Sequence, residues 1–128
     1  MPQTNIICLS GTREKLQMAA MMASVGVACG DDVIVFFSMN ALGFFVKGGV
    51  QEAPAEGEFG NLLAKKGVPP FKTLFQQAVE LGDAKLLPCS MAMDLLEITD
   101  DDLDDELGPA TGLTKFLNDA EDGKIITF

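Results

Sequence analysis

The sequence contains no histidine. Neither a Ser-His-Asp triad nor a Cys-His pair can therefore form within the chain, and the histidine ligands of bound metals are missing. This absence excludes the usual machinery of proteolysis and acyl transfer. We expect no metal site and a chemistry that proceeds without an imidazole base.

Cysteine is scarce, with three residues, Cys8, Cys29 and Cys89, and no Cys-x-x-Cys pair. An odd number of cysteines in no regular spacing argues against a disulfide framework. Reduced thiols are typical of a cytoplasmic protein. The N-terminus lacks a basic leader, and the apolar runs fall short of the about 18 residues that suggest a membrane span, so we expect a soluble protein.

Basic residues are also few, nine against nineteen acidic ones, which gives a net charge of −10. The excess is uneven, because residues 1–90 carry −1 and residues 91–128 carry −9. This charge repels phosphate backbones and anionic lipids, so neither nucleic acid nor a membrane surface is an expected partner. With 128 residues, 48% of them hydrophobic, the chain can bury the core of a single domain spanning residues 1–128.

Short apolar runs alternate with segments of helical periodicity. A continuous run such as Val33–Phe37 predicts a parallel strand covered on both faces. The alternation, with glycine-bearing turns, predicts a three-layer α/β/α sandwich around a mainly parallel sheet. We expect strands at Asn5–Leu9, Val33–Phe37, Lys85–Cys89 and Lys124–Thr127, and helices at Thr12–Ala28, Ala41–Lys47, Phe71–Leu81, Ser90–Ile98 and Leu113–Ala120.

Other local signals refine this prediction. The helix Thr12–Ala28 is apolar around most of its circumference, so one face is expected to pack on the sheet and another on more protein. Residues 51–60 are expected to form a mobile loop, and residues 100–106 a solvated acidic turn. Gly82 is the expected C-cap of the helix before it. Pro88 predicts a strand that ends there or lies at a sheet edge.

Ligands of parallel α/β sheets bind at the carboxyl ends of the strands. Three segments are predicted to meet at that rim: Ser10–Thr12, Ser38–Asn40 and Cys89–Met91. The turn Ser10–Thr12 opens a helix and either caps it or cradles an anion with its backbone N–H groups. The candidate substrate-binding residues are Ser10, Gly11, Thr12, Ser38, Met39, Asn40, Ser90, Met91 and Met93.

Cys89 is the candidate nucleophile, because it lies where a strand gives way to a helix whose free N–H groups and dipole favour a thiolate. Ser90 can cap the same helix. The alternative is that Cys89 is a small buried apolar residue, and that Met91 and Met93 pack in a core instead of surrounding a sulfur site. Cys8, within an apolar strand, and Cys29, at the carboxyl end of a helix, are expected to be inert packing residues.

Several segments resemble one family. Ser10-Gly11-Thr12-Arg13-Glu14-Lys15-Leu16, Phe36-Phe37 and above all Cys89-Ser90-Met91-Ala92-Met93-Asp94-Leu95-Leu96-Glu97-Ile98 are similar to the DsrE/DsrF-like proteins of sulfur trafficking. The similarity spans essentially the whole chain. It implies a sheet of about five parallel strands and assembly into homo-oligomers such as trimers, tetramers or hexamers.

The resemblance also implies that Cys89 carries sulfur as a persulfide or S-thiosulfonate and exchanges it with a thiol of a TusA-like or rhodanese-like carrier. No cofactor is implied, because one thiolate attacks a sulfane sulfur and a second thiolate later removes it. The protein would act as a sulfurtransferase or sulfur carrier. Two alternatives stay open: a non-catalytic oligomeric binding module for a small apolar ligand, and a thiol redox protein resolved by Cys8, Cys29 or another subunit.

Overall fold

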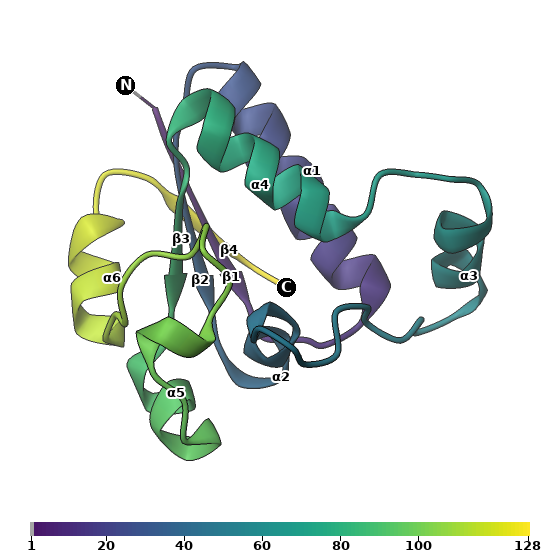
Figure 1. The fold of residues 1–128 in the computed structure, drawn as a ribbon. Helices are drawn as coiled ribbons and strands as arrows, with labels where there is room; N and C mark the ends of the chain where they lie inside the picture. The colour runs from purple at the N-terminus through teal and green to yellow at the C-terminus, as the bar shows by residue number, and fades with distance from the viewer. Residues whose placement is uncertain (1) are drawn as a thin grey trace.

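A computed structural model describes residues 2–128 and contains a sheet, six α-helices and two short 3-10 helices within them. Figure 1 shows their arrangement. The strands are β1 (Gln3–Cys8), β2 (Asp32–Phe37), β3 (Lys85–Pro88) and β4 (Lys124–Thr127). The helices are α1 (Arg13–Ala28), α2 (Met39–Leu42), η1 (Gly43–Phe45), α3 (Glu58–Lys65), α4 (Phe71–Gly82), α5 (Ser90–Leu96), η2 (Asp100–Asp102) and α6 (Leu113–Asp119).

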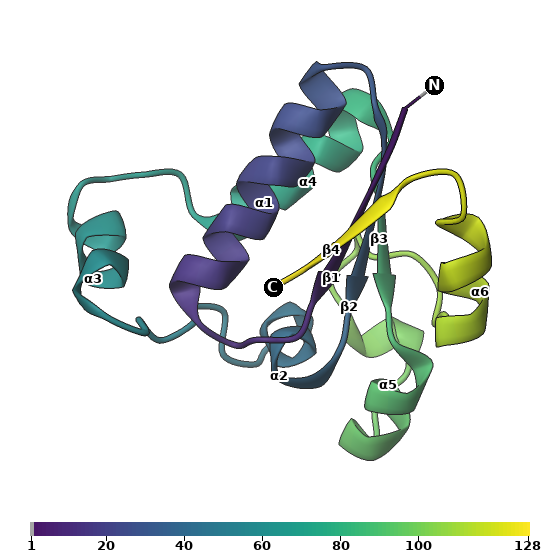
Figure 2. The same ribbon diagram turned by 180° about the vertical axis from the view of Figure 1, so that it is seen from behind.

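The four strands form one parallel sheet in the order β3-β2-β1-β4. Helices α1 and α4 cover one face and α6 covers the other, while α2 and α5 lie beyond the carboxyl ends of the strands (Figures 1 and 2). The expected three-layer α/β/α sandwich with a parallel sheet is thus confirmed. All four predicted strands are present, each within one or two residues of its predicted bounds.

The expectation of about five strands is wrong for residues 2–128, which contain four. Residues 108–112, called here the 108–112 strap, lie along the free edge of β3. Gly108 donates its N–H to the Leu86 carbonyl (2.7 Å) and Thr111 donates to the Pro88 carbonyl (2.9 Å). Pro88 has no N–H to donate in return, so pairing stops at an isolated Cys89–Thr111 bridge. As its proline predicted, β3 lies at the edge of the four-stranded sheet.

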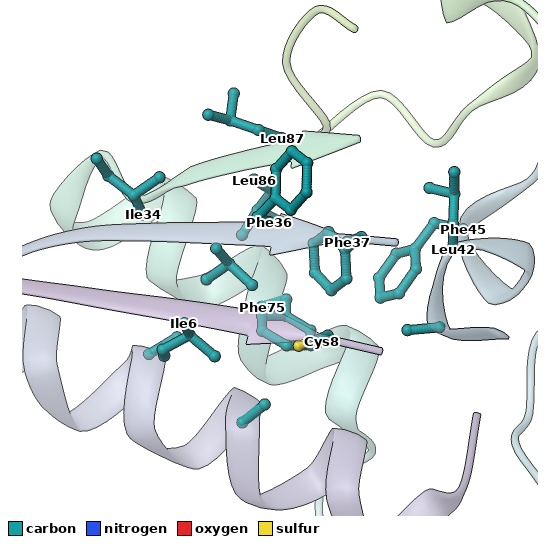
Figure 3. Packing of buried hydrophobic residues seen from close by; sticks show 14 of the residues in the cluster. Ile6, Cys8, Ile34, Phe36, Phe37, Leu42, Phe45, Phe75, Leu86 and Leu87 are labelled. Carbon is teal, nitrogen blue, oxygen red and sulfur yellow. The ribbon is translucent and has the colours of Figure 1, made fainter. Parts of the chain in front are cut away.

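The core is continuous through β2, whose successive side chains point to opposite faces. Phe37 lies on the α1–α4 side, with ring centroids 4.3 Å from Phe45 and 5.1 Å from Phe75. Phe36 lies on the other side, 4.9 Å from Phe116 of α6. Figure 3 shows Cys8, Phe37 and Phe75 together near the end of the sheet. The two aromatic contacts fix both helical layers to the same strand.

Three local predictions differ from the structure. The predicted loop 51–60 runs into a helix, α3, which no strong cap signal announced and whose Phe59 is 67% exposed. The predicted helix Ala41–Lys47 is instead α2 followed by η1. The C-cap of α4 is Asp83, in a left-handed conformation (φ 55°), and not Gly82. Gly82 is needed for packing, because a Cβ there would lie 2.0 Å from Val27 Cγ1.

Candidate functional site

The carboxyl ends of β1, β2 and β3 place the three predicted segments along one rim. Ser38 donates its N–H to the Cys8 carbonyl (3.0 Å), and Cys89 donates to the Phe37 carbonyl (2.9 Å). Ser10, which follows β1, donates to the carbonyl of the C-terminal Phe128 (3.3 Å). Ser10, Ser38 and Cys89 therefore follow one another across the rim in strand order.

Cys89 lies at the start of a helix, as expected, but its side chain is only 5% exposed. It is the N-cap residue of α5, and its carbonyl accepts the Met93 N–H (3.0 Å). No side-chain hydrogen bond caps this helix, so the expected capping role of Ser90 is not seen. Cys89 thus combines a helix start with nearly complete burial.

Two buried hydroxyl residues flank Cys89. Ser38 is 3% exposed and lies beside Cys89 on the neighbouring strand end. The preceding residues, Phe37 of β2 and Pro88 of β3, are paired in the sheet. Thr111, also 3% exposed, forms the isolated bridge with Cys89 on the other side. The Thr111 hydroxyl donates to the Pro109 carbonyl (2.9 Å). The immediate surroundings of Cys89 are therefore partly polar. Sequence reasoning missed Thr111, which lies far along the chain in a segment without periodicity.

The methionines near the rim divide into two groups. Met39 and Met91 are about half exposed, at 55% and 50%. Met93 is buried in the core at 4% exposure. Met39 also has a left-handed backbone (φ 52°), which is uncommon for a side chain of this size. Of the predicted methionine neighbours, the two exposed ones can meet an incoming molecule directly.

The turn Ser10–Thr12 contacts both the rim and the loop that leads into α3. Gly11 packs against Asn40, and a Cβ there would lie 3.0 Å from the Asn40 carbonyl oxygen. The Thr12 hydroxyl lies 3.4 Å from a carboxylate oxygen of Glu56, and the Arg13 N–H donates to the Pro54 carbonyl (2.9 Å). Thr12 is the N-cap of α1 without a side-chain capping bond. The turn is thus tied to residues 54–56 on its outer side.

The other two thiols lie in different environments. Cys8 is 1% exposed, and burial raises its pKa to about 12, in agreement with the predicted inert role. In register, Cys8 faces Phe37, and Phe37 faces Pro88. Cys8 and Cys89 are therefore two strand spacings apart, about 9.6 Å. The Cα atoms of two cysteines joined by a disulfide lie within about 7 Å of each other.

Cys29 is exposed, so its predicted packing role is wrong. It caps the carboxyl end of α1, at the opposite end of the sheet from Cys89. The last turn of α1 still packs on the fold through Gly26 and Val27, but Cys29 follows it in the turn that leads to β2, where its side chain is exposed. Neither Cys8 nor Cys29 is placed to form a disulfide with Cys89 in the same chain.

Two hollows open away from Cys89. The first, called the α3 hollow, has a volume of about 400 Å³ and lies between α1, α3 and α4. Its polar groups include Arg13, Gln17 and Lys72, and its apolar wall includes Leu63 and Phe71. The second, called the methionine hollow, has a volume of about 350 Å³ and is lined mainly from α1, by Met18, Met21, Met22, Val25 and Cys29.

Within residues 2–128 there is neither a cluster of metal ligands nor a helix able to span a membrane. No group of three or more Cys, Asp or Glu side chains is arranged to hold a metal ion. Among the helices of the same residues, none has the length and apolar character needed to cross a bilayer.

Comparisons with known proteins agree with this fold. The curated relative "Uncharacterized protein YrkE" of Bacillus subtilis (strain 168) is 28% identical over 155 residues, covering 98% of this chain and 96% of that protein. The crystal structure of ychN protein from E. coli aligns with a TM-score of 0.71 at 15% identity, with both chains covered completely.

A second solved structure, the protein of unknown function MTH1491 from Methanobacterium thermoautotrophicum, aligns with a TM-score of 0.67 at 9% identity, again over all of both chains. At such identities the two structures support the fold alone. Residues 54–128, which include α3 to β4 and all of the Cys89 segment, match the model of the DsrE/DsrF/DrsH-like family. The chain therefore belongs to the DsrE/DsrF/DrsH-like family, whose membership implies a role connected with sulfur.

Proposed function

We propose that this protein is a sulfurtransferase or sulfur carrier that holds sulfane sulfur on Cys89 and relays it to or from a carrier-protein thiol. The observation that carries the proposal is the position of Cys89, at the start of α5 on the rim where ligands of parallel sheets bind. Cys8 and Cys29 lack this position, since one lies within the core and the other at the far end of α1.

The reaction needs only thiolates and a sulfur donor. The Cys89 thiolate attacks the outer sulfur of thiosulfate, forming a persulfide and releasing sulfite, or attacks tetrathionate, forming an S-thiosulfonate and releasing thiosulfate. In the second half of the persulfide route, an acceptor thiolate attacks the outer sulfur. The bond from that sulfur to Cys89 Sγ breaks, and Cys89 leaves as a thiolate. Electrons and charge balance in each step without a cofactor.

The residues around Cys89 have proposed roles in positioning this sulfur. The hydroxyl of the buried Ser38 is proposed to donate a hydrogen bond to a charged sulfur on Cys89, whereas the Thr111 hydroxyl already donates to the Pro109 carbonyl and serves to hold the 108–112 strap in place. Met39 and Met91 are soft, flexible side chains at the surface, suited to contact the outer sulfur. The other candidate substrate-binding residues are Ser10, Gly11, Thr12, Asn40, Ser90 and Met93.

The setting and partners follow from the same proposal. A TusA-like or rhodanese-like carrier would supply the second thiol, and the free thiols suit a cytoplasmic location. We also expect a homo-oligomer, because α1 exposes Met18, Met21 and Val25 on one face although its other face is buried on the sheet. A second copy of the chain would cover this apolar face.

Intact-mass measurement tests the function. Since Cys29 is exposed and could react, the starting chain is Cys29→Ser. After incubation with thiosulfate, tetrathionate or polysulfide, this chain should gain sulfur, and the Cys29→Ser/Cys89→Ser chain should gain none. If the double variant accepted as much sulfur as the single variant, the proposal would be wrong.

One observation favours a second candidate, a non-catalytic binding module. The α3 hollow has a volume within the range of small-molecule sites, and it combines an apolar wall with Arg13, Gln17 and Lys72. Cys89 does not line it. If this is the functional site, Ala64→Phe should abolish saturable binding of an apolar anionic dye such as anilinonaphthalene sulfonate, while Cys89→Ser should leave it unchanged. Dye binding unaffected by Ala64→Phe would dismiss this candidate.

A further inference from the structure

The whole net charge of the protein lies in the segment that follows Cys89. Residues 90–122 contain eleven acidic residues and one lysine, a net charge of −10, and the rest of the chain is neutral. Some of these carboxylates have internal partners, since Asp104 pairs with Lys72, Asp105 with Lys47 and Asp119 with Lys115.

Asp94, Glu97 and Asp101 form no ion pair with another residue of the 2–128 range. All three are exposed. Asp94 and Glu97 belong to α5 and its C-cap, and Asp101 belongs to η2, which follows directly. Two unpaired carboxylates therefore lie on the helix that begins at Cys89, and Asp101 follows it, close enough to Lys47 to share with Asp105 in raising the pKa of that lysine.

Exposed apolar side chains accompany these charges. On α5, Met91 and Leu95 are separated by one helical turn, and Leu95 is 77% exposed. On α6, Leu113 and Leu117 have the same spacing and are also exposed. We call these side chains, with the exposed Leu96, the α5–α6 surface.

The two parts of this surface begin side by side at Cys89. Ser90, the first residue of α5, donates its N–H to the carbonyl of Thr111 (3.0 Å), two residues before α6 begins. From that junction α6 runs along the sheet face opposite α1 and α4, while α5 lies beyond the carboxyl ends of the strands (Figure 1). Cys89 therefore lies between two exposed apolar stripes, close to unpaired carboxylates.

We propose that the α5–α6 surface is the docking site for the acceptor of the relay, a protein segment that presents its reactive cysteine among lysine or arginine residues and an apolar side chain. The inference deepens the proposed function and rests on it. Burial of exposed leucines at an interface favours binding, whereas carboxylates at an interface favour binding only when they lie opposite cations. If two copies of this chain met through this surface, two negatively charged surfaces would face each other. We therefore expect self-association at another surface.

The test uses three short acceptor peptides with one cysteine and one leucine each, flanked by lysines, by serines or by glutamates. Transfer is measured by mass spectrometry from the sulfur-loaded Cys29→Ser chain. At low salt the lysine peptide should accept sulfur faster than the glutamate peptide by on the order of tenfold or more. The advantage should largely vanish at about 1 M salt, where the Debye length falls to about 3 Å.

Matched variants locate the effect. Neutralising the site with Asp94→Asn, Glu97→Gln and Asp101→Asn should remove most of the preference for the lysine peptide. Neutralising three exposed acids elsewhere, with Asp32→Asn, Glu58→Gln and Glu80→Gln, changes the net charge equally and should leave it intact. Likewise Leu95→Ser should slow transfer to the lysine peptide, and Leu81→Ser, at a leucine 80% exposed on α4, should not.

A second readout separates this inference from the function. Fluorescent versions of the peptides with serine in place of cysteine report binding without sulfur chemistry. If the lysine version binds at the α5–α6 surface but Cys89 never loads, the docking site stands and the relay fails. If Cys89 loads and all three peptides accept sulfur and bind equally, the relay stands and the docking inference is overturned.

Discussion

The two sides of the sheet differ in what they carry. On one side the long helices α1 and α4 pack on each other and on the central strands, and this side contains the cluster of Phe37, Phe45 and Phe75. On the other side and beyond the rim, the short helices α5 and α6 carry exposed leucines, and residues 90–122 carry the full net charge. The first side holds most of the aromatic core, whereas the second combines exposed leucines with the net charge.

The two buried thiols show the same contrast. Cys8 is the last residue of β1, on the side of α1, and burial raises its pKa to about 12 (Figure 3). Cys89 lies one residue past β3, at a helix start, between Ser38 and Thr111. The two buried thiols therefore have different surroundings, one within a strand and the other at a helix start.

The largest effect is expected from removing one aromatic ring on each side. Phe75→Ala and Phe116→Ala each remove a fully buried ring, so each should lower the free energy of unfolding by about 3–5 kcal/mol in urea titrations. Only Phe116→Ala should also reduce sulfur loading of Cys89, because α6 anchors the 108–112 strap beside it.

Loading should be measured where both variants are folded, with Phe75→Leu and Phe116→Leu as milder substitutes. Equal loss of loading in the two variants would contradict the division of roles between the two sides.

A smaller effect concerns Cys8 and pH. The folded protein keeps the Cys8 proton up to about 12, whereas the unfolded chain releases it near 9.0. Between these values the unfolded state binds fewer protons, so the free energy of unfolding should fall as pH rises, by about 1.4 kcal/mol per pH unit. Below 9.0 the contribution is fully present. Over this pH range, the free energy of unfolding measured by urea titration should fall more steeply with pH in the wild type than in Cys8→Val. Cys29→Val should behave as the wild type. Parallel slopes would show that Cys8 is not buried as described.

The smallest effect is local and should not reach Cys89. The Glu14 carboxylate accepts the N–H groups of Glu56 (2.8 Å), Gly57 (2.7 Å) and Gly60 (3.2 Å), which lowers its pKa. These hydrogen bonds hold α3 fully when the pH is above the ordinary pKa of a glutamate carboxyl. They are lost as the pH falls through the lowered pKa of Glu14.

Glu14→Gln should therefore speed amide hydrogen exchange at Gly57 and Gly60 and leave sulfur loading unchanged. Faster exchange in α5 as well would mean that α3 and the Cys89 region are coupled and would contradict the separation of the two sides of the sheet.

Much of the fold could be predicted from the sequence, because its signals are local. Apolar runs such as Val33–Phe37 identify buried strands, and parallel pairing then brings Ser10, Ser38 and Cys89 to one rim without further information. The position of Cys89 before a helix followed from the same pattern.

The rest depends on tertiary contacts that no window of sequence contains. Thr111 reaches Cys89 only because the 108–112 strap follows the edge of β3, and Pro88 limits that pairing to a bridge. The start of helix α3 is held from outside by the Glu14 carboxylate, so its residues 58–60 are predicted as part of the loop 51–60. The exposure of Cys29 depends on the path of the turn between α1 and β2, which the residues of the helix do not specify.

Native-state thiol labelling tests the central claim most directly, namely that Cys89 acts as a nucleophile in the folded protein. In the Cys29→Ser chain, iodoacetamide should modify Cys89 completely while Cys8 stays unmodified, and prior loading with tetrathionate should protect Cys89. Cys8 then serves as an internal measure of unfolding. If Cys89 and Cys8 were modified together, at the rate of global unfolding, Cys89 would be a packing residue and the relay would have no nucleophile.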